Sequence, residues 1–164
     1  WIKAYPCCLQ THSSIEAAAK ARAAGMTTGP IDVTVHPVSR QAAPYDDVTD
    51  ALQAKFSIPH TVAYTLLHGP PGVRDFAEID QAVRKLAEWV VVRTDRSLLE
   101  SEARFTTPEG FETRVESALG SPDHPMTTEQ LTAKVHDLAG DALDGVLDEP
   151  HEPAKRLLDA ACLS

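Results

Sequence analysis

The chain is organised around one stretch, Lys3-Ala4-Tyr5-Pro6-Cys7-Cys8-Leu9-Gln10-Thr11-His12. An alanine-rich segment follows it, opening on Ser13-Ser14-Ile15-Glu16 and ending at Gly25. The Ser13-x-x-Glu16 spacing is typical of a capping box and predicts a helix that begins there. His12 would then lie just outside a helix N-terminus, where free N–H groups and the positive dipole end favour anions and a neutral imidazole. The stretch therefore predicts a carboxylate-binding segment.

Three further segments have the alternation of β-strands. Ile31, Val33 and Val35 alternate with polar residues over 31–36, and Pro37 is expected to end that strand. Residues 103–107 and 111–115 alternate on either side of Thr107-Pro108-Glu109-Gly110, whose Pro and Gly positions suit a hairpin turn with a left-handed glycine. We therefore expect a sheet of at least three strands, covered by helices on one face.

Helical spacing accounts for much of the remainder. Ser57 is expected to cap a helix that runs to Gly69, and Thr127 or Thr128 one that ends at Gly140. A third amphipathic helix is expected to run from about residue 79 into Trp89-Val90-Val91-Val92, read only as core. Residues 39–50 are read as a loop, and Pro153 is expected to open a last helix. The prediction is one α+β domain over 1–164, a small antiparallel sheet with a β-hairpin covered by about five helices.

Composition excludes several classes of partner. The chain has 164 residues, 43% of them apolar and 24% charged, as is ordinary for one globular domain. Its net charge of −9 argues against nucleic acid and anionic membranes as partners. Residues 1–45 nevertheless hold four basic residues against two acidic ones, so an anion is attracted to the opening segment. No apolar run approaches the length of about 20 residues that spans a bilayer.

The cysteines bear on location and on metals. Three cysteines, two of them adjacent, build no disulfide framework and indicate a reducing compartment, so we expect a cytoplasmic protein. A metal site of Cys7, Cys8 and His12 is poorly supported, because adjacent cysteines rarely chelate one ion and no CxxC or HExxH motif is present. Cys7 and Cys8 are more simply read as small buried thiols, and no metal is expected.

Three ordered motifs carry a resemblance to a known family. The stretch at residues 3–12, with its Lys-x-Tyr-Pro-Cys-Cys-x-x-Thr-His pattern, resembles the MmgE/PrpD family. The second motif is Ala54-Lys55-Phe56-Ser57-Ile58-Pro59-His60, followed by Leu66-Leu67-x-Gly69; the family usually has Tyr where His60 stands. The third is Gly120-x-Pro122-x-His124-Pro125-Met126-Thr127. Together they extend over most of the chain.

The resemblance implies a two-part enzyme, of which this chain is the smaller α+β domain that closes over an all-helical N-terminal domain. Because the chain begins at Trp1 and not at Met, we expect a fragment that lacks the helical domain. Members of the family act on small carboxylates, are commonly homodimers, and work without iron–sulfur clusters or organic cofactors. A carboxylate substrate, a homodimer and no cofactor are therefore expected here.

Family chemistry needs a cation that holds carboxylates and groups that move the proton on the carbon next to a carboxylate. Lys3 suits the first task and His12 the second. Thr11 and the N–H groups at the start of the helix, including that of Ser14, are expected to add substrate contacts. Cys8 is also expected at the substrate; it stands where the decarboxylase branch has His, which makes decarboxylation the less favoured reaction.

Three functions remain open on the sequence alone. The first is a lyase of the 2-methylcitrate dehydratase type, with this chain as its substrate-closing domain. The second is an epimerase or racemase of an imino or amino dicarboxylate. The third, from a different class, is an isolated domain without activity that serves in closure or assembly. Replacement of His12 in the intact protein separates the enzymes from the assembly role.

Overall fold

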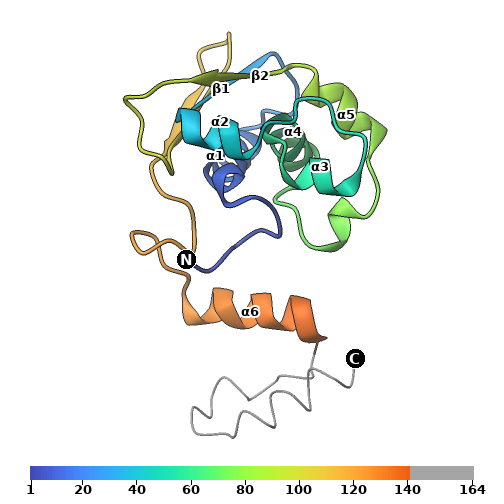
Figure 1. Cartoon of the computed structure of the whole chain (residues 1–164), viewed down its shortest axis with the longest axis vertical. Helices are drawn as coiled ribbons and strands as arrows, with labels where there is room; N and C mark the ends of the chain where they lie inside the picture. Colours follow the sequence, from blue (N-terminus) through green and yellow to red (C-terminus); the bar gives the residue numbers. More distant parts are fainter. Residues whose placement is uncertain (141–164) are drawn as a thin grey trace, which may run out of the picture. The chain divides into compact units, whose positions relative to one another are not determined.

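The structure is a computed structural model, and it describes residues 1–140. The chain divides into two compact units, Trp1–His124 and Pro125–Ser164, and each is considered by itself (Figure 1). The described residues contain four strands, six α-helices and two short 3-10 helices. The helix expected from Pro153 lies outside the described residues. Among residues 1–140 no helix is both long enough and apolar enough to cross a membrane.

The first unit is built on a four-stranded sheet with the strand order β2-β1-β3-β4. Its strands are β1 (Ile31–Val35), β2 (Val90–Thr94), β3 (Ala103–Thr106) and β4 (Glu112–Val115). β1 pairs with β3 and β3 with β4 in antiparallel fashion, whereas β1 and β2 are parallel. The hairpin between β3 and β4 turns at Gly110, whose φ of 91° is the left-handed conformation expected there. The predicted α+β class with a mostly antiparallel sheet is confirmed.

The prediction for Trp89–Val92 was wrong. The third amphipathic helix, α5 (Gln81–Ala87), ends before Trp89, and the valines form the edge strand β2. Val90 is buried, but Trp89 is 55% and Val91 47% exposed. The β-branched valines favour a strand, and its two-residue period sends alternate side chains to opposite faces. A continuous apolar run therefore need not lie wholly in the core.

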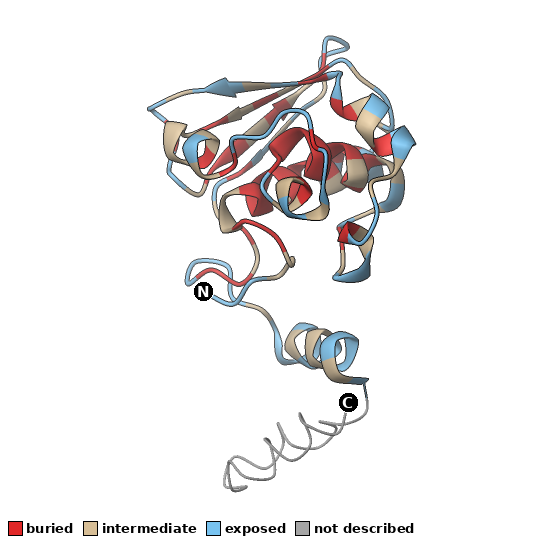
Figure 2. Ribbon diagram, turned by 45° about the vertical axis from the view of Figure 1, so that its right-hand side comes forward, coloured by how far each residue is buried: buried red, intermediate tan, exposed pale blue. Residues whose placement is uncertain are grey.

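Two helices, α1 (His12–Ala23) and α4 (Ile58–His68), pack against the sheet and against each other. The buried residues gather where these helices meet the strands (Figure 2). The main core consists of apolar side chains from both layers, among them Ala17, Ala18, Ile31, Val33, Val35, Ile58, Val62, Leu66 and Phe105. α5 packs on α4, whereas α1 also contacts β3 and β4. This packing fixes α1, and with it the residues at its start.

The shorter helices have local causes. The segment read as a loop contains the end of α2 (Pro37–Ala42), for which the His36 side chain accepts a hydrogen bond from the Val38 N–H. α3 (Ala51–Lys55) follows an Asp50 cap, and α4 begins as expected after Ser57, whose hydroxyl accepts from the His60 N–H. Short 3-10 turns occupy η1 (Leu9–Thr11) and η2 (Arg74–Phe76).

The second unit is described through α6 (Thr128–Ala139). The Thr127 side chain caps this helix, and Gln130 completes a capping box by accepting from the Thr127 N–H. Gly140 follows the last helical residue with a φ of 57°. Both ends of the helix are those predicted from Thr127 and Gly140.

Candidate active site

The three family-like motifs meet at the beginning of the chain. The Cys8 N–H donates to the Lys55 carbonyl at 2.8 Å, which joins the first motif to the second. The Ile2 N–H donates to the Gly120 carbonyl at 2.9 Å, which joins the first to the third. Residues 1–12 are therefore held between α3 on one side and the loop 117–124 on the other. Segments distant in the sequence, one of them more than a hundred positions away, are thus hydrogen-bonded to residues 1–12.

The helix that carries His12 begins differently from the expectation. His12 is the first residue of α1 and not a residue outside it, because the turn η1 leads directly into the helix. Ser13 and Glu16 form no capping box: the Ser13 hydroxyl donates to the Ser101 carbonyl, and Glu16 accepts from the Leu119 N–H. The two side chains that would form a local capping box are thus hydrogen-bonded to main-chain groups distant in the sequence.

His12 is completely buried. Its imidazole contacts the Tyr5 ring edge to face, with centroids 5.0 Å apart and planes at 68°. Burial raises the pKa of Tyr5 far above its ordinary value, and the negative charge of Glu16 adds to the effect. The Tyr5 hydroxyl therefore stays protonated at neutral pH. In this arrangement the imidazole has no surface for a ligand to touch, and only the phenol beside it is partly exposed.

Two lysines lie close to this buried layer. Lys3 is exposed, and its ammonium donates to the Cys7 carbonyl at 3.0 Å. The Lys55 ammonium lies 5.7 Å from the centre of the Phe76 ring, and both ammonium groups act electrostatically on the Cys7 thiol. Two cations that both act on Cys7 suit a substrate with more than one carboxylate. Sequence reasoning missed Lys55, although it belongs to the second motif.

Thr11 and the two cysteines form the turn behind Lys3. The Thr11 hydroxyl donates to the Cys8 carbonyl at 2.8 Å and lies 3.2 Å from the Cys7 sulfur. Burial raises the pKa of Cys7 to about 11, so it is a thiol and not a thiolate at neutral pH. The Cys8 sulfur instead contacts the Ala42 carbonyl at 3.8 Å. In the part of the chain that the structure describes, no group of three or more His, Cys, Asp or Glu side chains is placed to hold a metal ion.

Of the five residues predicted for the site, Lys3 alone is exposed. Thr11, His12 and Ser14 are completely buried, and Cys8 is nearly so. The Ser14 hydroxyl has no hydrogen-bond partner among residues 1–140. The main-chain N–H of His12 donates to the Leu9 carbonyl. The structure thus brings all five residues into one region, with Lys3 at the surface and the others directly behind it.

A second buried histidine stands in the first turn of α4. His60 is 2% exposed, and its Nδ1 has no hydrogen-bond partner among the described residues. Burial lowers the pKa of His60 below its ordinary value of 6.5, and the nearby Asp80 charge opposes this only in part. His60 is therefore a neutral imidazole at pH 7, with one buried ring nitrogen that has no hydrogen-bond partner among the described residues.

This lowered pKa predicts how stability depends on pH. The unfolded chain binds a proton at His60 near pH 6.5, whereas the folded chain does so only at lower pH, so stability is lost as the pH falls below 6.5. We expect urea unfolding at about pH 5.5 to show a smaller loss, relative to pH 7.5, in His60→Gln than in the wild type. The exposed His68→Gln serves as the control. An equal pH slope in wild type and His60→Gln would contradict the assignment.

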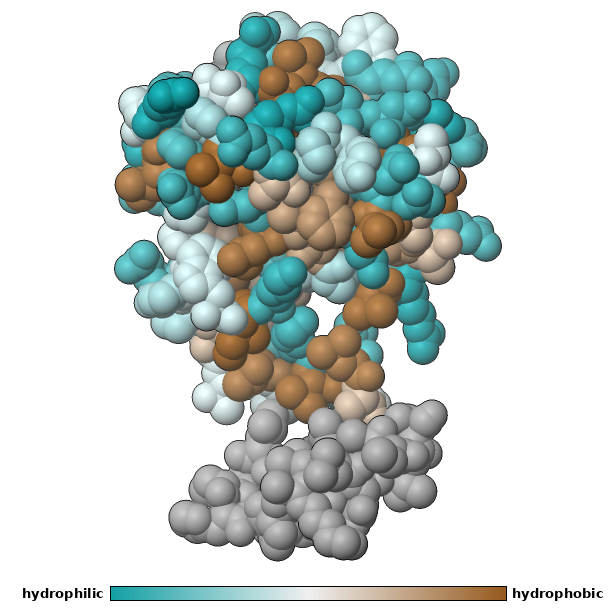
Figure 3. Space-filling model, viewed as in Figure 1, coloured by the Kyte–Doolittle hydropathy of each residue, from teal (hydrophilic) through white to brown (hydrophobic). Residues whose placement is uncertain are grey.

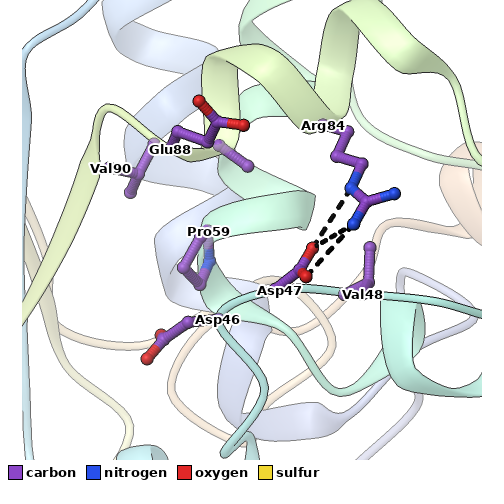
Figure 4. A pocket seen from close by; sticks show the side chains of 8 residues that line it. Asp46, Asp47, Val48, Pro59, Arg84, Glu88 and Val90 are labelled. Atoms are coloured by element: carbon purple, nitrogen blue, oxygen red, sulfur yellow. Dashed lines mark hydrogen bonds and ion pairs between the residues drawn. The ribbon is translucent and has the colours of Figure 1, made fainter.

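Two pockets lie elsewhere on the first unit. The larger, of about 450 Å³, is lined by Asp46, Asp47, Glu88 and Arg84 together with apolar side chains (Figure 4). Its only lining cation among the described residues, Arg84, is paired with both carboxylate oxygens of Asp47. Asp46 is paired with Arg40, which does not line the pocket, so the lining itself carries three carboxylates and one guanidinium and is unsuited to a carboxylate. The smaller one, of about 340 Å³, is mainly apolar and lies beside Trp89.

Comparison with known proteins identifies a family. No curated protein matches the chain. The family described as the MmgE/PrpD C-terminal domain matches residues 5–160, which include the second and third motifs and the first motif from Tyr5 onward; Lys3 lies before the matched residues. The chain therefore belongs to the MmgE/PrpD family, as its C-terminal domain.

Proposed function

We propose that the intact protein is a cofactor-independent lyase of the 2-methylcitrate dehydratase type, and that this chain is the domain that closes over its substrate. The observation that carries the proposal is the pair of ammonium groups, Lys3 and Lys55, beside the helix that begins with His12. Two cations bind the carboxylates of a di- or tricarboxylate, and an imidazole moves a proton. Membership of the family is consistent with this chemistry.

The proposed reaction is the elimination of water. A base takes the proton from the carbon next to a carboxylate, and the electron pair of that bond becomes the new double bond. The carbon–oxygen bond of the neighbouring hydroxyl breaks, and the hydroxyl leaves as water after it gains a proton. The two lysines stabilise the negative charge that develops on the carboxylate. His12 is proposed to transfer the proton; since it is buried against the Tyr5 ring, that ring must move when substrate binds.

The surface beside Lys55 is consistent with a covering domain. Leu52, Tyr45 and Phe56 are exposed by 67%, 41% and 37%, and the Tyr45 N–H donates to the Phe56 carbonyl, which keeps the last two together. Apolar side chains also reach the surface among hydrophilic ones on the face shown in Figure 3. We propose that the helical N-terminal domain covers the apolar residues beside Lys55 and so places its own groups next to the two lysines.

The test is turnover by the intact protein of citrate and 2-methylcitrate, followed by the absorbance of the new double bond. Lys3→Ala and Lys55→Ala are each expected to raise KM about tenfold, because each removes one charge-assisted contact to a carboxylate. Lys85→Ala, on α5, is the matched control and should leave KM unchanged. Turnover of no tricarboxylate would exclude the lyase. Deuterium exchange next to a carboxylate without elimination would point to the epimerase.

A further inference from the structure

Glu16 lies one helical turn after His12, on the same face of α1, and has no part in the chemistry above. Its side chain is only 14% exposed. One carboxylate oxygen accepts a hydrogen bond from the Leu119 N–H at 2.6 Å, and the other lies 4.0 Å from His124 Nδ1. A largely buried carboxylate on the helix of the candidate base thus holds a loop that is 103 residues distant in the sequence.

That loop, residues 117–124, is closed on itself by its own hydrogen bonds. The Gly120 N–H donates to the His124 carbonyl at 2.8 Å, and the His124 N–H donates to the Ser121 hydroxyl at 3.0 Å. The hydroxyl groups of Ser117 and Ser121 are 2.7 Å apart. Because these bonds tie both ends of the loop together, fixing Leu119 fixes the whole loop.

The same loop holds the beginning of the chain. The Gly120 carbonyl accepts from the Ile2 N–H at 2.9 Å. A Cβ added to Gly120 would lie 1.9 Å from the Ile2 carbonyl oxygen, and the φ of 88° at this glycine is one that other residues rarely adopt. Only glycine permits the two main chains to come this close. The residue held next to this contact is Ile2, and Lys3 follows it directly.

We propose that Glu16 is a positioning residue for Lys3: it fixes the loop 117–124 to α1, and through Ile2 the loop sets where the Lys3 ammonium stands relative to His12. The inference rests on the proposed function, since it gives Lys3 the task of binding a carboxylate. Its structural part, that Glu16 determines the order of residues 1–3, stands without that function.

The charge of Glu16 is secondary to its role as an acceptor. Burial raises the pKa of Glu16, and the Leu119 N–H, His124 and Lys20 oppose this rise. Tyr5 is the other titratable group on which Glu16 acts. A glutamine at this position keeps an oxygen that accepts from the Leu119 N–H without the cost of burying a charge. Glu16→Gln should therefore preserve the position of Lys3, whereas Glu16→Ala should release it.

The experiment compares Glu16→Ala and Glu16→Gln in the intact protein with a matched control, Asp80→Ala. Asp80, the N-cap of α5, also accepts from a main-chain N–H, that of Ala82 at 2.7 Å, and is paired with His68 outside the site. Hydrogen exchange of the Ile2 and Leu119 amides is measured first. We expect protection to fall about tenfold or more in Glu16→Ala only, because the acceptor for the Leu119 N–H is lost there.

Kinetics with 2-methylcitrate distinguish a role of Glu16 in positioning Lys3 from a role in the stability of the fold alone. Glu16→Ala should raise KM about tenfold with kcat little changed, and Glu16→Gln should restore KM. In a Lys3→Ala background, Glu16→Ala should raise KM no further, since the ammonium it positions is gone. A lowered apparent kcat with unchanged KM would show a merely structural role and overturn the proposal.

Gly120→Ala provides a second variant if Glu16→Ala does not fold. Its Cβ pushes the Ile2 main chain away from the other side of the same contact, so it should lower Ile2 protection and raise KM as Glu16→Ala does. Unchanged Ile2 protection in both variants would overturn the positioning role, whatever the activity. Lost protection in a protein that turns over no tricarboxylate would contradict only the proposed function.

Discussion

Replacing His12 by alanine in the intact protein is expected to lower turnover by about 10²-fold or more, the usual loss when a general acid or base is removed. The structure sharpens this expectation, because His12 is the first residue of α1 and is enclosed against the Tyr5 ring. A buried imidazole is held in one orientation, which favours proton transfer along a single direction. The measurement is kcat with 2-methylcitrate per folded molecule, with the folded fraction taken from near-ultraviolet circular dichroism.

Because His12 is buried, its removal also costs stability, and the control has to separate the two effects. His12→Asn keeps a polar side chain of similar breadth but cannot take up a proton near neutral pH. It should fold better than His12→Ala and be equally slow. His68→Ala, at an exposed histidine on α4, should leave kcat as it is. A His12→Asn enzyme within about fivefold of the wild type would assign His12 to packing and support the assembly role.

A marked loss of stability is expected from replacing Glu102. Its side chain is 1% exposed, yet one carboxylate oxygen lies 2.6 Å from Arg114 Nε on β4, and the other accepts from the Leu99 N–H at 3.1 Å. Glu102→Ala removes the ion pair with Arg114 and the hydrogen bond from the Leu99 N–H, and is expected to lower the free energy of unfolding by about 2 kcal/mol. The expected loss of free energy is no larger because the Arg114 side chain is half exposed, so that water can replace Glu102 as its hydrogen-bond partner. Urea unfolding at neutral pH measures the change.

Glu112→Ala is the matched control, since Glu112 pairs with Arg104 at 3.7 Å on the exposed surface of the same hairpin. It should cost less than about 0.5 kcal/mol. Acid gives a second check. Burial raises the pKa of Glu102, but Arg114 and the Leu99 N–H outweigh it and leave the pKa below its ordinary value of 4.5. The stabilisation is therefore present above pH 4.5 and is lost as the pH falls further. A difference between wild type and Glu102→Ala that persists in acid would contradict this account.

Elements with their own local signals could be predicted from the sequence. Ser57 and Gly69 marked the ends of α4, and Thr127 and Gly140 those of α6, because caps involve residues within one turn. The hairpin at Gly110 followed from its turn residues in the same way. The family was equally accessible, since its motifs are short patterns along the chain, and the match over residues 5–160 confirmed it.

The start of α1, the strand β2 and the layout of the site were decided by contacts distant in sequence. Val90 is in a strand because it pairs with Ile31. Ser13 and Glu16 form no local cap, because Ser13 bonds to the Ser101 carbonyl and Glu16 to the Leu119 N–H. By itself the sequence determined the α+β class, the family, and Lys3 and His12 as candidates. The tertiary structure decided that His12 is buried, that Lys3 and Lys55 both act on Cys7, and that Glu16 ties the loop 117–124 to α1. The physical reason is that main-chain and carboxylate groups bond to whatever partner folding brings within reach, and a pattern along the chain does not contain that partner.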